Sequence, residues 1–324
     1  MSYADQQFKA TCRDILENGT STKNEKVRPR WDDGTPAYTI KKFGIVNRYD
    51  LRKEFPAITL RRIGLKSAMD EILWIYQKKS NNIHELNSHI WDQWADNTGS
   101  IGKAYGYQMD LKHIYKDVTD DGIQNAFDCE FIGKNTARTC VDRHTRRHIA
   151  RQSIKPGCNG KWEMDQMDKV IYDLKNTPFS RRIMTSMWNP QEQYEMHLAP
   201  CAYSMTYNVT EENGKLVLNA ILNQRSQDML AANGWNIAQY AILLMMLARE
   251  TEMIPGELIH IIADAHIYDR HIDMIKELLN REEFDAPTVT LNPDVKNFYD
   301  FTTDDLIIEN YKFGEQIKNI PIAV

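Results

Sequence analysis

Apolar residues recur at helical spacing along much of the chain. Residues 3–17 place their apolar side chains on one side of a predicted helix, which Asn18-Gly19 ends. The same spacing predicts further helices at residues 67–77, 164–174, 236–248 and 272–279. The segment 236–248 is apolar on nearly every side, which is typical of a helix in the middle of a domain.

Alternating apolar and polar residues predict strands in the second half of the chain. Residues 203–209 and 215–224 flank Asn213-Gly214, a dipeptide that favours the tight turn of a β-hairpin. Two shorter strands are predicted at residues 257–262 and 288–291. This mixture of elements, without internal repeats or an interdomain linker, favours one α+β domain over residues 1–324.

Residues 110–162 differ from the rest of the chain, because they are polar and basic and lack a clear hydrophobic period. We interpret them as an insertion within the single domain, outside its core. Their basic residues could form an RNA or partner surface: Arg138, Arg143, Arg146, Arg147, Arg151 and Lys155. Such a surface normally carries interleaved aromatic side chains, which this segment lacks, so a solvated lobe is favoured.

The insertion also holds three of the five cysteines, together with two histidines one helical turn apart. A zinc site would draw on Cys129, Cys140, His144, His148 and Cys158. The separation between Cys129 and Cys140 fits common zinc-site spacings poorly, so no metal is expected.

Composition narrows the class of protein. With 42% hydrophobic and 10% aromatic residues, the 324-residue chain can bury a sizeable core. No apolar stretch reaches the ~18 residues that a membrane span needs, and no targeting segment is evident, so a cytoplasmic protein is expected. Five scattered cysteines do not suggest a disulfide framework, and a net charge of -5 argues against bulk nucleic-acid binding.

Cys201 is the strongest candidate nucleophile. It follows Pro200 at the start of a predicted strand. A free thiol has a pKa of roughly 8.5, so attack by the thiolate requires a nearby cation or base. Arg225 and Ser226, at the end of the partner strand, could supply a cation and a hydroxyl donor. Because a lone cysteine is more often a small buried apolar residue, these neighbours must decide between the two interpretations.

Several other polar residues are candidate ligands of an anion or a sugar. Arg28 lies in an early loop, and Arg181-Arg182 follow the helix predicted before them. Guanidinium groups match phosphate geometry, although a surface pair is more often simply solvated. His266 and Tyr268 fall on one face if the segment around them is extended.

Taken together, these motifs resemble the thymidylate synthases of the folate-dependent type. The matching segments keep the family's order: residues 71–74, 90–96, 102–106, 180–183, 198–201, 224–228, 236–240, 264–268 and 321–324. They cover most of the chain outside residues 110–162, and the loop 27–36 most resembles the form found in bacilli and their phages. Each short motif is weak alone, but the ordered set is specific.

The resemblance implies a methyltransferase that converts dUMP to dTMP in nucleotide biosynthesis. 5,10-Methylenetetrahydrofolate would be the cosubstrate, acting as one-carbon donor and reductant and leaving as dihydrofolate. The implied fold is a mixed β-sheet packed by helices, assembled as a homodimer through the sheet face. The alternative on the same fold is a dUMP hydroxymethylase, in which water completes the reaction. Asn236 favours uracil, and Trp91 with the intact C-terminus favours hydride transfer.

The resemblance also assigns catalytic roles. Cys201 would add to C6 of uracil, and Tyr105 would help to remove the C5 proton. Glu71, on an apolar helix, would relay protons, because burial raises the pKa of a carboxyl group toward neutrality. Asp228 would face the folate pterin, where a carboxylate can accept hydrogen bonds and stabilise positive charge.

Two sets of binding residues are implied. Those for dUMP are Arg28, Arg181, Arg182, Gln224, Arg225, Ser226, Asp228, Asn236, His266 and Tyr268, with Arg181 and Arg182 reaching across from the partner subunit. Those for folate are Arg61, Trp91, Trp94, Leu198, Asp228 and Val324. The amide of Asn236 carries a donor and an acceptor, which can pair with O4 and N3–H of uracil.

Four positions depart from the commonest family pattern. Ala202 follows the nucleophile where many members carry histidine, a change shared with the bacillus-phage branch. Ala232 and Ala263 replace glycines, and each added methyl group brings bulk beside the site. Arg61 stands where lysine is usual, which keeps the charge but alters its shape.

Overall fold

The computed structural model of the chain describes residues 1–127, 129–132, 139–142, 155–156 and 161–324. Between residues 128 and 160, the description covers only the backbone of short strands. The basic cluster and the cysteine and histidine set of residues 129–158 therefore lie outside the described side chains, and both hypotheses about them stay predictions.

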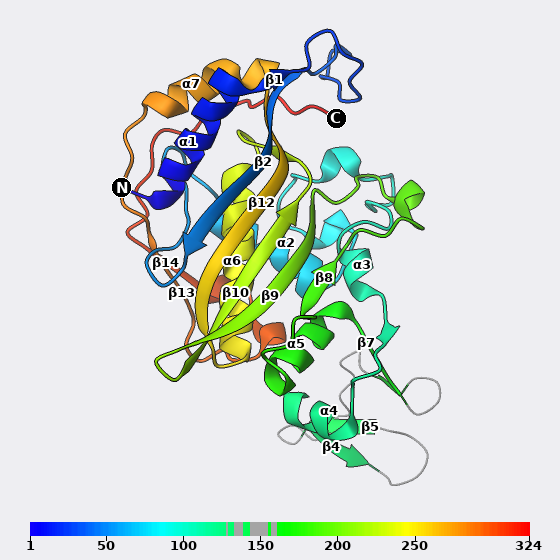
Figure 1. Cartoon of the computed structure of the whole chain (residues 1–324). Coiled ribbons are helices and arrows are strands. Elements are labelled where there is room, and N and C mark those ends of the chain that lie inside the picture. Colours follow the sequence, from blue (N-terminus) through cyan, green and yellow to red (C-terminus); the bar gives the residue numbers. More distant parts are fainter. Residues whose placement is uncertain (128, 133–138, 143–154, 157–160) are drawn as a thin grey trace.

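A mixed β-sheet forms the centre of the molecule (Figure 1). Its strands within the described residues are β1 (Thr20–Ser21), β2 (Thr39–Asp50), β8 (Met184–Ser186), β9 (Ala202–Glu212), β10 (Lys215–Gln224), β11 (Gln227–Asp228) and β12 (Ile254–Tyr268). They are ordered β1-β2-β12-β10-β9-β8, and β11 pairs with β12. Both β10 and β11 run parallel to β12, whereas the other neighbours are antiparallel. The predicted hairpin is confirmed, since β9 and β10 flank Asn213-Gly214.

The helices of the described residues are α1 (Tyr3–Asn18), α2 (Leu65–Ile72), α3 (Gly106–Asp110), α4 (Asp120–Phe127), α5 (Gln166–Asn176), α6 (Asn233–Glu250) and α7 (Ile272–Asn280). A π-helical turn, Leu73–Gln77, continues α2. Figure 1 shows α2 and α6 behind the sheet and α1 beside α7 near one edge. The opposite face of the sheet, toward the viewer, is left open by these helices.

Helix α6 is the core helix that its sequence predicts. Its residues from Ile237 to Leu244 are all buried, so no side of this stretch faces water. It packs against α2 on one side and against β10 and β12 on the other. This fixes both helices relative to the strands that carry the candidate site residues.

Smaller elements surround this centre. Further strands are β3 (His113–Ile114), β4 (Cys129–Ile132), β5 (Thr139–Asp142), β6 (Lys155–Pro156), β7 (Trp162–Met164), β13 (Thr288–Leu291) and β14 (Leu306–Glu309). Short 3-10 helices cover Ile83–Glu85, Asp92–Trp94, Gln193–Glu195, Asp269–His271, Phe298–Asp300 and Thr303–Asp305. In the part of the chain that is described, no helix combines the length and apolar character that a membrane span requires.

The predicted insertion is less peripheral at its ends than its composition suggests. Ile123 and Phe127 on α4 and Trp162 on β7 are buried, and they belong to the hydrophobic core. Helix α4 packs on α5, where the Tyr172 hydroxyl lies 3.1 Å from the backbone nitrogen of Thr119. The apolar residues of this segment are too widely spaced to produce a helical period, so the sequence alone indicates a peripheral position.

The alternation of less and more exposed side chains in β2 is interrupted at Gly44, without a shift in the register of its pairing with β12. In the pairing of β2 with β12, Ile45 lies opposite Ile262 and Phe43 lies opposite Asp264. Gly44 has a φ of 77°, in the left-handed region that favours glycine. Beyond this position, the β12 residues from Asp264 to Tyr268 keep the same register with β2 and are held extended.

Candidate active site

Cys201 lies just before β9, beside the end of β10. The backbone nitrogen of Arg225 donates to the carbonyl of Cys201 at 2.9 Å, which ties the two strand ends together. The Arg225 guanidinium donates to the carbonyls of Pro200 (3.0 Å) and Ala199 (2.6 Å), and its Nη2 lies 3.7 Å from Cys201 Sγ. The hairpin therefore places the Arg225 guanidinium beside the Cys201 sulfur, as the sequence predicts.

Opposing effects act on the Cys201 thiol, which is half-buried and free of disulfides. Burial raises its pKa, because a thiolate is poorly stabilised away from water. The charges of Arg225 and Arg28 and the hydroxyl of Tyr105 act in the other direction without cancelling the rise. The thiol of the free protein is therefore mostly protonated at neutral pH.

Tyr105 supports the nucleophile from the loop before α3. Its hydroxyl oxygen accepts a hydrogen bond from the Cys201 backbone nitrogen at 3.1 Å. Its ring is buried and packs edge-on against Trp91, with centroids 4.8 Å apart. The backbone of Tyr105 has a φ of 46°, which is rare for a residue with a side chain and marks a conformation that the surrounding packing enforces.

Glu71 is buried on α2 between two indole groups. Trp91 Nε1 donates to one carboxylate oxygen at 3.0 Å, and Trp235 Nε1 donates to the other at 2.6 Å. Burial raises the pKa of Glu71, and these hydrogen bonds limit the rise because they favour the charged form. A raised pKa is the direction expected for a carboxyl group on this apolar helix.

Asp228, on β11, is held in its ionised form. Burial opposes its ionisation, but the neighbouring His271 and backbone N–H donors outweigh burial and lower its pKa. Asp228 Oδ1 accepts from the nitrogens of Leu230 (2.9 Å) and Ala231 (3.0 Å) and lies 3.5 Å from His271 Nδ1. The chain thus places a carboxylate beside the start of α6.

His266 and Tyr268 lie together on β12, as the predicted extended segment requires. Their ring centroids are 5.0 Å apart. Asp264 Oδ1 lies 2.9 Å from His266 Nδ1 and orients that ring. Burial raises the pKa of Tyr268 to about 12, so its hydroxyl stays protonated and can donate.

Asn236 is a half-buried residue of α6 surrounded by glutamine side chains. Its amide hydrogen-bonds with those of Gln224, Gln227 and Gln239. Of these, only Gln224 was singled out from the sequence. Asn236 and Gln239 are three residues apart on a helix, a spacing that places their side chains side by side. This spacing is a signal that could have identified Gln239. Ser226, predicted with Gln224, is half-buried, and its carbonyl accepts from the Gln224 amide.

The predicted phosphate-binding arginines fall into two groups. Arg225 and Arg28 lie close enough for their charges to act on Cys201, and Arg28 also acts on Tyr268. Arg181 and Arg182 are exposed on the loop between α5 and β8. Among the described residues, neither takes part in an ion pair or contributes to the electrostatics of Cys201.

The predicted folate residues surround Glu71 and Asp228. Trp91 and Trp94 contact each other with ring centroids 5.5 Å apart, and Leu198 is a half-buried residue packed against the core. Arg61 is buried, and its Nη2 donates to the carbonyl of Leu230 at 2.6 Å, next to Asp228. An ionised carboxylate such as Asp228 can accept hydrogen bonds from the N–H donors of a pterin, and indole rings can pack against its planar ring.

Val324 lies by the loop that carries Arg28. Its nitrogen donates to the carbonyl of Arg30 at 2.9 Å, and its carbonyl accepts from the Arg30 nitrogen at 2.8 Å. Three residues earlier, the carbonyl of Pro321 lies 2.8 Å from Nε2 of His271, the histidine beside Asp228. The C-terminal segment therefore runs from the predicted folate side to the predicted phosphate side.

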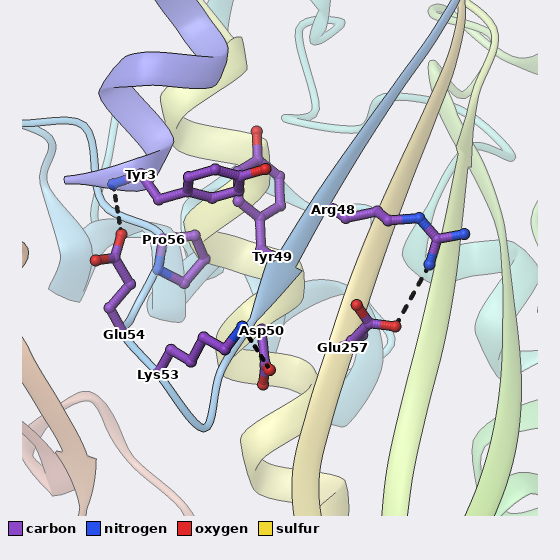
Figure 2. A pocket seen from close by; sticks show the side chains of 8 residues that line it. All are labelled: Tyr3, Arg48, Tyr49, Asp50, Lys53, Glu54, Pro56 and Glu257. Carbon is purple, nitrogen blue, oxygen red and sulfur yellow. Dashed lines mark hydrogen bonds and ion pairs between the residues drawn. The ribbon is translucent and has the colours of Figure 1, made fainter.

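Two other kinds of site are a metal centre and a pocket outside the predicted site. Within the described residues, no group of three or more His, Cys, Asp and Glu side chains is placed to hold a metal ion. A pocket of about 390 Å³ between α1 and β2 is shown in Figure 2. None of the predicted site residues lines it. Arg48 pairs with Glu257 at 3.4 Å, and the backbone nitrogen of Tyr3 donates to the Glu54 carboxylate at 2.5 Å. We assign it no ligand.

Comparisons with known proteins agree with this geometry. The family model for thymidylate synthase matches residues 6–324. The chain is 38% identical over 321 residues to thymidylate synthase 1 of Bacillus subtilis (strain 168), an alignment covering 98% of each chain. It is 37% identical over 321 residues to the thymidylate synthase of Bacillus phage phi3T, again covering 98% of each. The solved structure of thermostable thymidylate synthase A from Bacillus subtilis matches with a TM-score of 0.78 and 37% identity, covering 100% of both chains. The predicted resemblance and fold class are confirmed.

Proposed function

The chain belongs to the thymidylate synthase family, whose enzymes methylate dUMP, and from this premise we propose a reductive methylation of dUMP to dTMP with 5,10-methylenetetrahydrofolate. The reaction would proceed through a covalent bond between Cys201 and C6 of uracil. The observation that carries the proposal is the contact of Cys201 Sγ with Arg225, at 3.7 Å, inside a ring of candidate nucleotide ligands.

The covalent step would begin with transfer of the thiol proton to water. The Cys201 thiolate would then form a bond to C6, and the C5–C6 π electrons would move toward O4 to give an enolate. Arg225 and Arg28 favour the thiolate, while burial keeps the thiol protonated in the free protein. The nucleophile is therefore poised rather than permanently charged, which limits side reactions of a reactive sulfur.

Nucleotide binding would use side chains that the fold brings to one site. Arg28 and Arg225 would hold the phosphate, and His266 with Tyr268 would bind the 3′ hydroxyl of the sugar. Asn236 would pair with uracil through its amide. Support for this arrangement comes from the 5.0 Å separation of the His266 and Tyr268 rings and from the accessibility of Asn236.

Proton transfer would depend on Glu71 and Tyr105. A carboxyl group whose pKa is raised by burial can both accept and release a proton near neutral pH. The two indole donors hold Glu71 in place, so its position does not change when its charge does. Tyr105 would act nearer the nucleophile, where its hydroxyl already contacts the Cys201 backbone.

The folate would supply the one-carbon unit and the hydride. Asp228, ionised in this structure, would accept hydrogen bonds from the pterin, and Trp91, Trp94 and Leu198 would line its apolar side. Arg61 would place positive charge near the acidic tail of the cosubstrate. The segment ending at Val324 would exclude water from the site.

A homodimer would complete the phosphate site. Arg181 and Arg182 are exposed and unpaired within the described residues of a single chain, and the front face of the sheet is uncovered (Figure 1). Exposed apolar side chains include Phe43 (87%) and Met184 (50%), on two strands of that sheet. Pairing two such faces would bury them and bring each arginine pair to the partner's nucleotide.

Product analysis tests the proposal. Wild-type protein incubated with dUMP and methylenetetrahydrofolate is expected to give dTMP and dihydrofolate in equal amounts. Cys201→Ser is expected to bind dUMP but lose nearly all turnover, because an alcohol is a far weaker nucleophile at this pH. Tetrahydrofolate with hydroxymethyl-dUMP as the products would contradict reductive methylation, and full turnover by Cys201→Ser would contradict the covalent step.

A further inference from the structure

Asn236 is the accessible member of a chain of buried side-chain amides. Its Oδ1 accepts from Gln224 Nε2 at 3.1 Å and from Gln227 Nε2 at 3.3 Å. Its Nδ2 donates to Gln239 Oε1 at 2.9 Å. The three glutamines are each no more than 2% exposed, whereas Asn236 is half-buried. A ligand can therefore reach only the asparagine among these four residues.

Backbone carbonyls fix which end of each amide is the donor. Gln224 Nε2 also donates to the carbonyl of Ser226 at 3.0 Å, and Gln227 Nε2 donates to the carbonyl of Asp228 at 3.1 Å. A carbonyl can only accept, so both glutamines must turn an N–H in this direction. The Asn236 atom that faces them is consequently its oxygen.

His260 secures the far end of the chain. It is fully buried on β12, with Nε2 2.8 Å from Gln224 Oε1. Burial lowers the pKa of His260 to about 3, so the ring is neutral at physiological pH. Because Gln224 Oε1 accepts, the proton of the neutral ring sits on Nε2. Gln224 is thus held at both ends of its amide.

Gln239 secures the other side of Asn236. Its Oε1 accepts from Asn236, and its buried Nε2 has no hydrogen-bond partner among the described residues. That nitrogen lies close enough to Glu71 to favour the ionised carboxylate. Turning the Gln239 amide over would set N–H against N–H at Asn236 and oxygen against carboxylate at Glu71. Both contacts are repulsive, so the observed orientation is favoured.

We propose that Gln227 and Gln239 are positioning residues that make the enzyme select uracil over cytosine by locking the Asn236 amide in one orientation. This inference rests on the proposed function. Uracil presents a donor at N3 and an acceptor at O4, whereas cytosine presents an acceptor at N3 and a donor at its amino group. An asparagine that is free to turn can match either base, but a locked asparagine can match only one.

The test compares the equilibrium Kd values of dUMP and dCMP. Gln227→Met, Gln239→Met and the double variant keep the side-chain length and remove the amide. In the double variant, we expect the ratio of the dCMP Kd to the dUMP Kd to fall about tenfold, equivalent to ~1.4 kcal/mol. Each single variant is expected to lower this ratio by about threefold, since two of the three glutamine contacts to Asn236 remain, whereas the double variant keeps only that of Gln224.

Gln77→Met is the matched control. The Gln77 amide donates to the carbonyls of Phe298 (3.0 Å) and Phe301 (2.9 Å), away from Asn236, so its loss should lower stability without changing the ratio. An unchanged ratio in the folded variants overturns the inference, as does an equal loss of affinity for both nucleotides. If the double variant does not fold, the single variants decide. Failure of the wild type to bind dUMP would instead overturn the proposed function itself.

Discussion

Glu71 shows how one residue's surroundings can set its chemistry. Its carboxylate is buried, yet each oxygen receives an N–H from a different tryptophan. Burial disfavours the charge and the indoles favour it, with burial the larger effect. A group with a raised pKa in the folded state binds a proton more tightly there than in the unfolded chain. Its ionisation therefore costs stability as pH rises.

Glu71→Gln should reveal this cost. A glutamine is neutral at every pH, so the free energy of unfolding of wild type, relative to the variant, should decrease as pH rises. The decrease should begin near the ordinary glutamate pKa of about 4.3 and end above the raised folded value. Urea unfolding of both proteins at a series of pH values measures it. A difference that stays constant with pH would contradict the assigned shift.

The same variant should lose activity. If Glu71 relays protons, its replacement is expected to lower kcat by about 100-fold or more, which is the usual contribution of a general acid or base. Binding of dUMP should survive, because Glu71 does not belong to the proposed nucleotide ligands. Steady-state kinetics alongside dUMP titration separates the two effects, and a loss confined to dUMP affinity would argue against the relay.

Tyr105→Phe addresses the nucleophile's neighbour. The change removes the hydroxyl that contacts the Cys201 nitrogen at 3.1 Å and that favours the thiolate. We expect kcat to fall about 100-fold. The dUMP Kd should change little, because the ring and its contact with Trp91 remain. Titration with dUMP and steady-state assays check both values, and wild-type kcat would remove Tyr105 from the proposed mechanism.

The sequence predicted a contact between two residues correctly where recognisable motifs contain both of them. Cys201 and Arg225 are brought together because the Asn213-Gly214 turn sets the hairpin register between their strands. It missed Gln239, although its partner Asn236 lies three residues earlier on the same helix. It also missed His260, whose partner Gln224 lies on another strand, so nothing local in the sequence indicates that contact.

At the scale of elements, strand β2 was missed although it is one of the longest strands. Alternation fails across it, because between residues 40 and 49 the less exposed positions are even-numbered before Gly44 and odd-numbered after it. The five predicted helices and the hairpin are present, since a periodic pattern or a continuous apolar run marks each, whereas the short helices α3 and α4 were not predicted. The pairing of Asp264 to Tyr268 with β2 continues in the same register beyond Gly44.

Substitutions at Gly44 should show how the left-handed backbone conformation at this position affects stability. A Cβ at this position meets no atom within 4 Å, so steric overlap is not the issue, but its φ of 77° is unfavourable for a branched side chain. Gly44→Val is expected to lower the free energy of unfolding by about 1–2 kcal/mol or more. Gly44→Asn should cost less, because asparagine tolerates this region. Urea denaturation measures both, and equal losses would contradict the role of backbone conformation.

At the scale of the whole molecule, the open sheet face and the exposed arginines both bear on whether the protein acts as a dimer. Phe43, Val46 and Met184 are all at least half exposed, and Arg181 and Arg182 lie on the loop beside the last of these. In the proposed arrangement, a single chain would leave Cys201 without the full set of phosphate-binding arginines. A dimer through this face would supply the missing arginines, so activity should depend on assembly.

Mixing two inactive variants tests this dependence. Cys201→Ser keeps both arginines, whereas the double variant Arg181→Ala, Arg182→Ala keeps the cysteine. After equal amounts are mixed, unfolded and refolded together, half of the dimers should be mixed and carry one complete site. About a quarter of wild-type activity is expected from random pairing in a two-fold symmetric dimer. Activity no higher than that of the separate variants would place the arginines outside the partner's site.

The two indoles on Glu71 have an optical consequence. Tryptophan emission responds to the charge of a group hydrogen-bonded to the indole nitrogen, and Trp91 and Trp235 both donate to this carboxylate. The free protein therefore carries its own fluorescent indicator of the proton on Glu71. Subtracting the signal of Glu71→Gln isolates these two rings from the other tryptophans, so the proton can be followed without substrate, cosubstrate or added dye.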